Sequence, residues 1–137
     1  MPPINNWDAV SPTASWTCDT CGQAIKHADH GWVEWLTFLG HGPEVSPRGT
    51  KIRIVHNFEH SPRCQYSPRC QYSQADLGEG ICLSDASLIE FMGPDGLKRL
   101  LEMLAEDKVG KVELLELLEI IKRIHIPRYE QARLHFR

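Results

Sequence analysis

The chain has 137 residues, of which 42% are hydrophobic and 24% are charged, and its net charge is −3 with a pI near 6.1. This composition is typical of a folded globular protein and excludes one whose whole surface is basic enough to wrap nucleic acid. No apolar run approaches the roughly 18 residues of a membrane span, and residues 1–6 lack the basic and apolar stretches of a secretory signal. We therefore expect a cytoplasmic protein with no membrane span, whose thiols stay reduced.

Five cysteines stand at positions 18, 21, 64, 70 and 82. An odd number of cysteines in a reducing compartment does not suit a disulfide framework and favours metal binding. Cys82 lies in a short apolar run, so we expect it to be buried as a small hydrophobic side chain. The other four are candidates for a functional site.

The first half of the chain predicts a β-hairpin. Residues 1–15 are rich in Pro, Asn, Ser and Thr and predict an irregular lead-in. Residues 31–39 have the aromatic and β-branched content of a strand, and residues 50–56 alternate in polarity as a half-buried strand does. Turn-forming residues fill positions 40–49 between them. We therefore expect a hairpin with a long loop, with Trp16, Trp32 and Trp35 in its core.

A perfect tandem repeat follows the hairpin. The hexapeptide Ser-Pro-Arg-Cys-Gln-Tyr occupies residues 61–66 and again residues 67–72. Two copies are too few for a repeat architecture, which needs about three units to bury a shared core. The repeat therefore indicates a local duplication, in which one of Cys64 and Cys70 is redundant.

The second half predicts helices. Ser87 and Glu90 have the spacing of a capping box, which opens a short helix that Gly93 can end. Pro94 suits the first turn of a second helix, and Pro127 begins a last short one. Between them, residues 111–125 predict a third helix with an apolar stripe of Leu114, Leu117, Leu118, Ile121 and Ile124. Its charged residues, Arg123 included, are expected largely on the opposite face.

Cys18 and Cys21 belong to a Cys-x-x-Cys-Gly turn, which is the form of a zinc knuckle. Gly22 permits the left-handed backbone conformation that closes such a turn. Two further ligands are expected from the base of the hairpin, where four candidates stand: His56, His60, Cys64 and Cys70. The sequence therefore predicts a zinc ion as cofactor in a structural site, bound by Cys18, Cys21, His56 and Cys64, with His60 and Cys70 as alternates.

Three catalytic interpretations of these cysteines and histidines lack part of their motif or context. A redox Cys-x-x-Cys pair needs a βαβ context, which this sequence does not predict. A metalloprotease needs His-Glu-x-x-His, whereas here Glu59 directly precedes His60. A nuclease of the HNH type would have an acidic residue before His56, where Val55 stands. We therefore expect a non-enzymatic zinc-binding module, with a zinc-dependent nuclease-like hydrolase as the alternative.

The last 16 residues form the most basic stretch of the chain. Five cations stand here against the single carboxylate of Glu130. One interpretation is a solvated helix face, and the other is a phosphate-contacting surface with Arg123, Arg128 and Arg133 as its residues. The module would then be a regulator or adaptor that contacts DNA or a protein partner. A further alternative is a structural homodimer through the leucine-rich helix at 111–125.

The segments Trp-Thr-Cys-Asp-Thr-Cys-Gly at 16–22, Gly-Trp-Val-Glu-Trp at 31–35 and Ile-Arg-Ile-Val-His at 52–56 resemble small bacterial zinc-ribbon-like proteins of unassigned activity. The resemblance extends from residue 16 to the end of the chain. It implies a zinc site and a helical tail, and it supplies no activity. The doubled hexapeptide departs from that pattern and leaves the fourth ligand open.

These expectations combine into an α+β protein. Residues 1–15 are the lead-in, residues 16–83 form a zinc-stapled β-hairpin domain, and residues 84–137 form a helical region.

Overall fold

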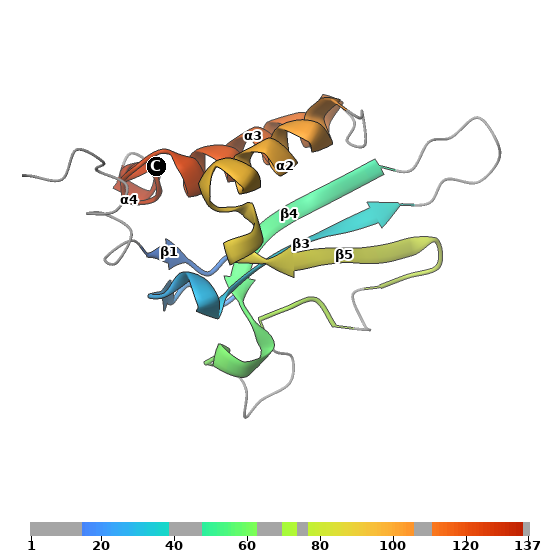
Figure 1. The fold of residues 1–137 in the computed structure, drawn as a ribbon. Helices are drawn as coiled ribbons and strands as arrows, with labels where there is room; N and C mark the ends of the chain where they lie inside the picture. Colours follow the sequence, from blue (N-terminus) through green and yellow to red (C-terminus); the bar gives the residue numbers. More distant parts are fainter. Residues whose placement is uncertain (1–14, 39–47, 63–69, 74–76, 106–110, 136–137) are drawn as a thin grey trace, which may run out of the picture.

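The computed structural model describes residues 15–38, 48–62, 70–73, 77–105 and 111–135. Within them the strands precede the helices, which confirms the predicted α+β class (Figure 1). The elements in chain order are β1 (Trp16–Thr17), β2 (Ala24–Ile25), η1 (Ala28–His30), β3 (Gly31–Phe38), β4 (Arg48–His56), η2 (Phe58–His60), β5 (Ile81–Ser87), η4 (Leu88–Phe91), α2 (Gly93–Ala105), α3 (Lys111–His125) and α4 (Tyr129–His135).

The predicted hairpin forms two neighbouring strands of the three-stranded sheet, with β3 in the centre. β3 and β4 pair in antiparallel register from Gly31 opposite His56 to Phe38 opposite Arg48. Their connection, residues 39–47, lies outside the described residues. The register shifts between Glu34 and Leu36, which marks a β-bulge on the β4 side.

A residue with an unusual backbone conformation lies at this bulge. Lys51 has a φ of 56°, a left-handed conformation that residues other than glycine seldom adopt. Its N–H donates to Oε1 of Glu116 at 3.0 Å, and its carbonyl accepts from the Tyr72 hydroxyl at 2.8 Å. The two contacts satisfy backbone groups that the bulge removes from the β ladder.

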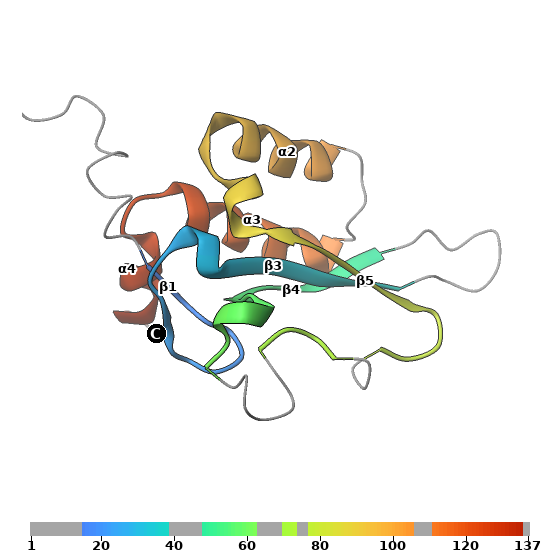
Figure 2. The ribbon, with the colours of Figure 1, turned by 60° about the horizontal axis from the view of Figure 1, so that its bottom comes forward.

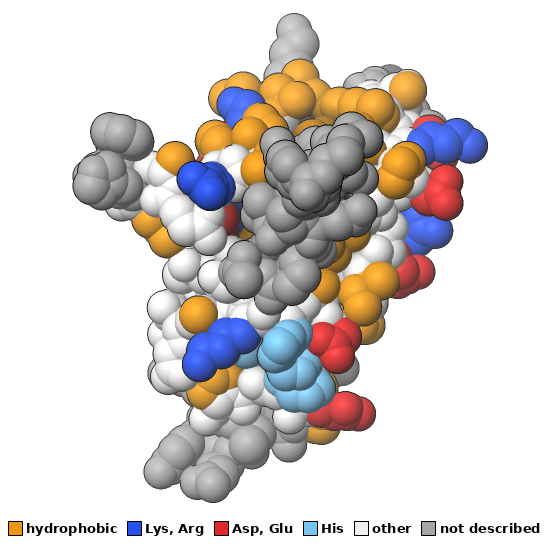
Figure 3. All heavy atoms as spheres, turned by 60° about the vertical axis from the view of Figure 1, so that its left-hand side comes forward, with side chains coloured by type: hydrophobic (Ala, Val, Ile, Leu, Met, Phe, Trp, Pro, Cys, Tyr) orange, Lys and Arg blue, Asp and Glu red, His pale blue; other side chains and the backbone are white. Residues whose placement is uncertain are grey.

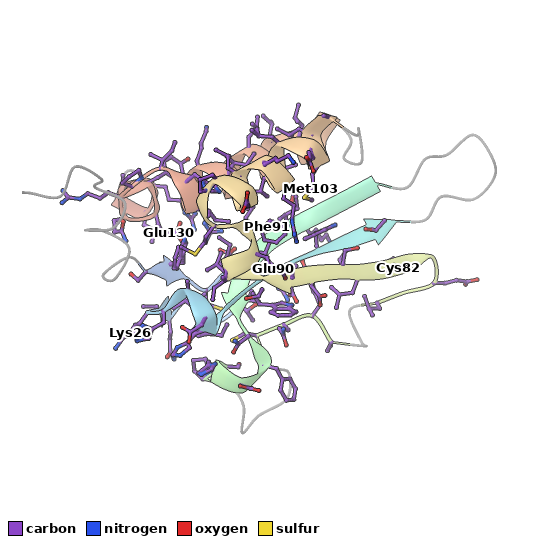
Figure 4. The ribbon with its side chains drawn as sticks, viewed as in Figure 1. Lys26, Cys82, Glu90, Phe91, Met103 and Glu130 are labelled. Atoms are coloured by element: carbon purple, nitrogen blue, oxygen red, sulfur yellow. The ribbon has the colours of Figure 1, made fainter. Side chains whose placement is uncertain are left out.

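β5 was not predicted from the sequence. It pairs with β3 from Trp32 opposite Ser87 to Phe38 opposite Ile81, which gives the strand order β4-β3-β5. Cys82 is exposed near the start of β5, at the opposite end from η4 (Figure 4). The expectation that it is buried was wrong, because its apolar run forms an edge strand of the described sheet rather than a segment enclosed on both faces.

Helices cover one face of this sheet. α2 and α3 lie on one side, and residues 70–73 and 77–80 pass along the other (Figure 2). Trp35 of β3 meets Phe91 edge to face, with 6.3 Å between the ring centroids. Trp16 is buried and Trp32 and Trp35 pack against the core, as predicted. The apolar core includes Val33, Ile54, Val55, Leu88, Phe91, Leu100, Leu117 and Ile120.

The predicted helix signals are largely confirmed. The capping box at Ser87 and Glu90 opens the 3₁₀ helix η4, and the Ser87 N–H donates to Oε2 of Glu90 at 3.2 Å. Gly93, with a φ of 69°, turns the chain into α2.

The predicted apolar stripe of α3 is confirmed in part, because Leu117 is buried and Ile121 and Ile124 pack against the core. Leu117 and Ile120 are fully buried, whereas Leu114 is exposed. Arg123, expected on the charged face, is 5% exposed. Arg123 is buried because it has partners contributed by segments more than 100 residues earlier.

Candidate metal centre

Cys18 and Cys21 lie on a tight turn between two very short strands. β1 and β2 pair through Trp16 opposite Ile25 and Thr17 opposite Ala24. Between them the Cys18 N–H donates to the Gln23 carbonyl at 2.9 Å, and the Gly22 N–H donates to the Cys18 carbonyl at 3.0 Å. Gly22 has a φ of 78°, so this position requires the conformational freedom of glycine, as predicted.

Backbone amides of this turn point at the sulfur atoms. The Thr20 N–H lies 3.4 Å from Sγ of Cys18, and the Gln23 N–H lies 3.4 Å from Sγ of Cys21. Amide donors of this kind stabilise sulfur when it carries negative charge. The turn is therefore organised for thiolates.

His56 stands at the end of β4 with its ring orientation fixed. Its Nε2 lies 3.1 Å from the carbonyl oxygen of Ala24. Because a carbonyl can only accept, Nε2 carries the hydrogen in this bond, and the neutral ring presents the lone pair of Nδ1. Nδ1 lies 3.5 Å from Sγ of Cys21 and 3.8 Å from Sγ of Cys70.

Cys70 reaches the site from the segment that crosses the open face of the sheet. The Ser61 hydroxyl donates to Sγ of Cys70 at 3.1 Å and accepts from its N–H at 3.2 Å. The Cys70 carbonyl accepts from the Thr20 hydroxyl at 2.6 Å. Both the side chain and the backbone of Cys70 are thereby held against the Cys18–Cys21 turn.

The four potential ligand atoms of Cys18, Cys21, His56 and Cys70 all lie within 4.8 Å of one another. In a tetrahedral site with metal–sulfur bonds of about 2.3 Å, ligand atoms stand roughly 3.5–3.8 Å apart. The two distances from Nδ1 of His56 match that spacing. Three of the residues are buried and only Cys21 is partly exposed, so this cluster could hold a metal ion.

Burial sets the protonation states of these groups. Desolvation raises the pKa of the Cys21 thiol, and it raises the pKa of the Cys70 thiol to about 12. Burial also lowers the pKa of His56, which favours the neutral imidazole that can act as a ligand. These raised pKa values favour the protonated thiols of Cys21 and Cys70 without a cation, and a bound metal ion would supply the charge that stabilises them as thiolates.

Cys64, the cysteine favoured from the sequence, lies outside the described residues, and its alternate Cys70 takes part in the cluster. The other alternate, His60, is not in the cluster. Its Nδ1 is bonded to Oδ1 of Asn57 at 2.8 Å, and its ring stacks on His30 with 3.7 Å between centroids. Together with His27 these rings form an imidazole patch on the surface (Figure 3).

Comparison with protein-family models, curated proteins and solved structures found no match for this chain. The functional argument therefore rests on the geometry and chemistry of the cluster.

A buried arginine joins the turn of the candidate metal site to the C-terminal helices. Nη1 of Arg123 lies 2.7 Å from Oδ2 of Asp19, in the cysteine turn, and Nη2 lies 2.7 Å from Oε2 of Glu130 in α4. Nη2 also donates to the Thr17 carbonyl at 3.1 Å. Glu130 lies beside β1, where Oε2 accepts the Thr17 N–H at 2.9 Å (Figure 4). No pattern in the sequence indicated these contacts, because Thr17 and Asp19 lie more than 100 residues from Arg123.

Burial alone would lower the pKa of Arg123, but its bonds to Glu130 and Asp19 raise it. Burial alone would likewise raise the pKa of Glu130, but Arg123 and Arg133 lower it. The charged forms therefore hold one another in the interior.

Two of the three arginines predicted to contact phosphate form ion pairs with carboxylates of this chain instead. Arg123 is buried, and Arg133 is ion-paired with Glu130 and Asp19. The prediction that Arg123 lies on the solvent-facing side of its helix, where it could contact phosphate, was wrong for this reason. Arg128 is exposed and adopts a φ of 64°.

Within the described part of the chain, no helix has both the length and the apolar character needed to cross a bilayer.

Proposed function

We propose that this chain is a non-enzymatic zinc-binding adaptor, in which Cys18, Cys21, Nδ1 of His56 and Cys70 bind one structural zinc ion. The observation that carries the proposal is the convergence of three sulfur atoms and one imidazole nitrogen within 4.8 Å. A set of thiolate and imidazole donors with tetrahedral spacing suits Zn²⁺ better than the oxygen-binding cations.

The donor count supports a structural site over a catalytic one. A catalytic zinc site keeps three protein ligands and an open position for water or substrate. Four protein donors converge here, and three of the four residues are buried. The nuclease-like alternative would require one of them to leave the metal.

The duplicated hexapeptide supplies a matched control for the metal test. Cys64 and Cys70 stand in identical six-residue contexts, and Cys70 belongs to the cluster while Cys64 lies outside the described residues. We expect one zinc ion per chain in the purified protein by elemental analysis, and we expect it to be retained in Cys64→Ser. Zinc should be lost in Cys18→Ser and in Cys70→Ser. A wild-type protein without zinc would refute the proposal, and zinc lost only in Cys64→Ser would transfer the fourth ligand to Cys64.

An adaptor role for a protein partner is supported by the outer surface of the helices. Hydrophobic side chains gather over the helical layer in Figure 3. Leu101 of α2 is 49% exposed and Leu115 of α3 is 70% exposed, a cost that a partner could offset. A second copy of the chain is the alternative partner, as expected for the leucine-rich helix, and light scattering over a range of concentrations would reveal it.

DNA contact is the less favoured alternative, because Arg123 and Arg133 are paired with carboxylates. It would require binding that weakens steeply as salt increases. If the protein bound a DNA duplex with that salt dependence, DNA contact would become the favoured function.

A further inference from the structure

The fourth ligand is held differently from the other three. Cys18 and Cys21 belong to a turn that is bonded to β4: the Asp19 N–H donates to the Ile54 carbonyl at 2.9 Å, and the Ile54 N–H donates to Oδ2 of Asp19 at 2.8 Å. His56 belongs to β4 itself. Cys70 belongs to residues 70–73, the ligand strap, which contains no helix or strand. Its position therefore depends on side-chain contacts.

A buried ion pair of the sheet supplies several of these contacts. Oε2 of Glu34, on the central strand, accepts the Tyr72 N–H at 2.8 Å and Nε of Arg53 at 2.7 Å. Nη2 of Arg53 donates to the Cys70 carbonyl at 3.1 Å, and the guanidinium lies 3.4 Å from the centre of the Tyr72 ring. The pair thus holds the strap at residue 70 and again at residue 72.

Glu34 is a costly residue for a sheet interior. Its side chain is completely buried, and desolvation raises its pKa more than the neighbouring Arg53 lowers it. Its Oε1 has no hydrogen-bond partner among the described residues. Replacing a buried ion pair with apolar side chains often leaves stability unchanged or improves it, so packing of the sheet does not by itself explain this carboxylate. The contacts of Glu34 with the ligand strap explain why a carboxylate stands at this position.

We propose that Glu34 and Arg53 are positioning residues for the metal site, which hold Cys70 at the fourth ligand position. This inference rests on the metal site proposed above. Without the pair, the ion would keep Cys18, Cys21 and His56 and lose its fourth protein ligand. The site would then have an open coordination position, which is the arrangement of catalytic rather than structural zinc.

The test is pulsed alkylation of the zinc-loaded protein with N-ethylmaleimide, followed by mass mapping of each cysteine. Glu34→Gln removes the buried charge at nearly constant shape. Glu102→Gln is the matched control, because Glu102 is an exposed glutamate paired with Lys98 on α2. The exposed thiol of Cys82 serves as an internal standard for reagent access.

We expect Cys18, Cys21 and Cys70 to be protected in wild type and in Glu102→Gln. In Glu34→Gln, Cys70 should be alkylated at least about tenfold faster than Cys18, with zinc affinity reduced about 10–100-fold in a chelator competition, as for other residues that orient metal ligands. Equal protection of Cys70 in Glu34→Gln and wild type would overturn the inference, and so would simultaneous exposure of all three cysteines. A wild type whose cysteines gain no protection from zinc would instead refute the metal site itself.

Arg53→Lys gives an independent measurement if Glu34→Gln folds poorly. Lysine keeps the positive charge beside Glu34 but cannot reach Glu34 and the Cys70 carbonyl with the fork of a guanidinium. We expect Cys70 to be alkylated selectively in this variant too, at a rate between those of wild type and Glu34→Gln. Wild-type protection of Cys70 in Arg53→Lys would contradict a positioning role for the pair.

Discussion

The metal end of the molecule and its helical layer are stabilised by different interactions. The metal end, which comprises β1, β2, the end of β4 and the ligand strap, has two strands of only two residues each. Such a ribbon is too small to be stable by itself in water. The helical layer buries Leu100, Leu117 and Ile120 against Ile54 and the rest of the sheet core. We therefore expect the metal end to need the cross-link of a bound ion, whereas the helical layer can rely on apolar burial.

Arg123 is where the two regions meet. It belongs to α3, yet its guanidinium binds Asp19 and the Thr17 carbonyl in the metal end and Glu130 in α4. The Trp16 indole also donates to the Arg123 carbonyl at 3.1 Å. Substitution of Arg123 should therefore destabilise both regions. Substitutions elsewhere should destabilise one region and leave the other unchanged.

Removal of the metal should have the largest effect. Structural zinc contributes about 10–16 kcal/mol in small zinc-finger peptides, because the site forms only on folding. We expect a chelator, or Cys18→Ser, to abolish protection of the amides of residues 16–25 against hydrogen exchange. Amides around Leu117 in α3 should keep most of their protection. Equal loss of amide protection in both regions would show that they unfold as one unit, and would contradict separate stabilisation of the two ends.

Arg123→Ala should have the second-largest effect and lower the free energy of unfolding by about 3–5 kcal/mol, because it leaves the buried carboxylate of Glu130 without its main partner. Unlike metal removal, it should increase hydrogen exchange in both regions. Chemical denaturation measures the loss of stability. Arg99→Ala, which removes an exposed ion pair with Glu90, is the control and should cost less than about 1 kcal/mol.

Leu117→Ala should act on the helical layer alone. The side chain is fully buried, and truncation of such a leucine typically costs about 2–5 kcal/mol. Zinc affinity, measured by chelator competition, should stay at the wild-type value, because Leu117 is not among the residues of the metal cluster. A parallel fall in zinc affinity would mean that the core and the metal site are coupled more closely than their contacts indicate.

The smallest effect concerns pH. The pKa of Glu130 is lowered from its ordinary value of 4.5, by Arg123 and Arg133 against the effect of burial. A carboxyl with a lowered folded-state pKa contributes stability that is fully present above its unfolded value and is lost as pH falls through the folded value. We therefore expect the stability difference between wild type and Glu130→Gln to shrink as the pH falls below about 4.5. A difference that does not change with pH would show that Glu130 acts only by its shape.

Local signals explain which parts of the fold could be predicted. The alternation at 50–56, the Cys-x-x-Cys-Gly turn and the capping box at Ser87 each depend on neighbours in the chain, and each was found in the structure. β5 was missed because Ile-Cys-Leu-Ser-Asp-Ala-Ser alternates weakly in polarity, and its pairing with β3 is a contact across more than 40 residues. Periodicity alone also placed Arg123 on the solvent-facing side of α3, since it treats every arginine as solvated.

The candidate site divides in the same way. Cys18, Cys21 and His56 could be named from spacing, because the turn and the strand end are local features. The duplication made Cys64 and Cys70 equivalent by sequence, and only distances in the folded chain bring Cys70 to the cluster. Glu34 and Arg53 carried no sequence signal as supports for a ligand.

The α+β class, the cysteine turn and the residue types that could bind a metal ion were predictable without the structure, because they follow from the chemistry and spacing of neighbouring residues. Only the folded chain shows that the Cys70 thiol lies beside the cysteine turn, that the Arg123 guanidinium is buried and that Glu34 lies inside the sheet. Those outcomes depend on desolvation and on hydrogen bonds between distant segments, and both exist only once the chain has folded.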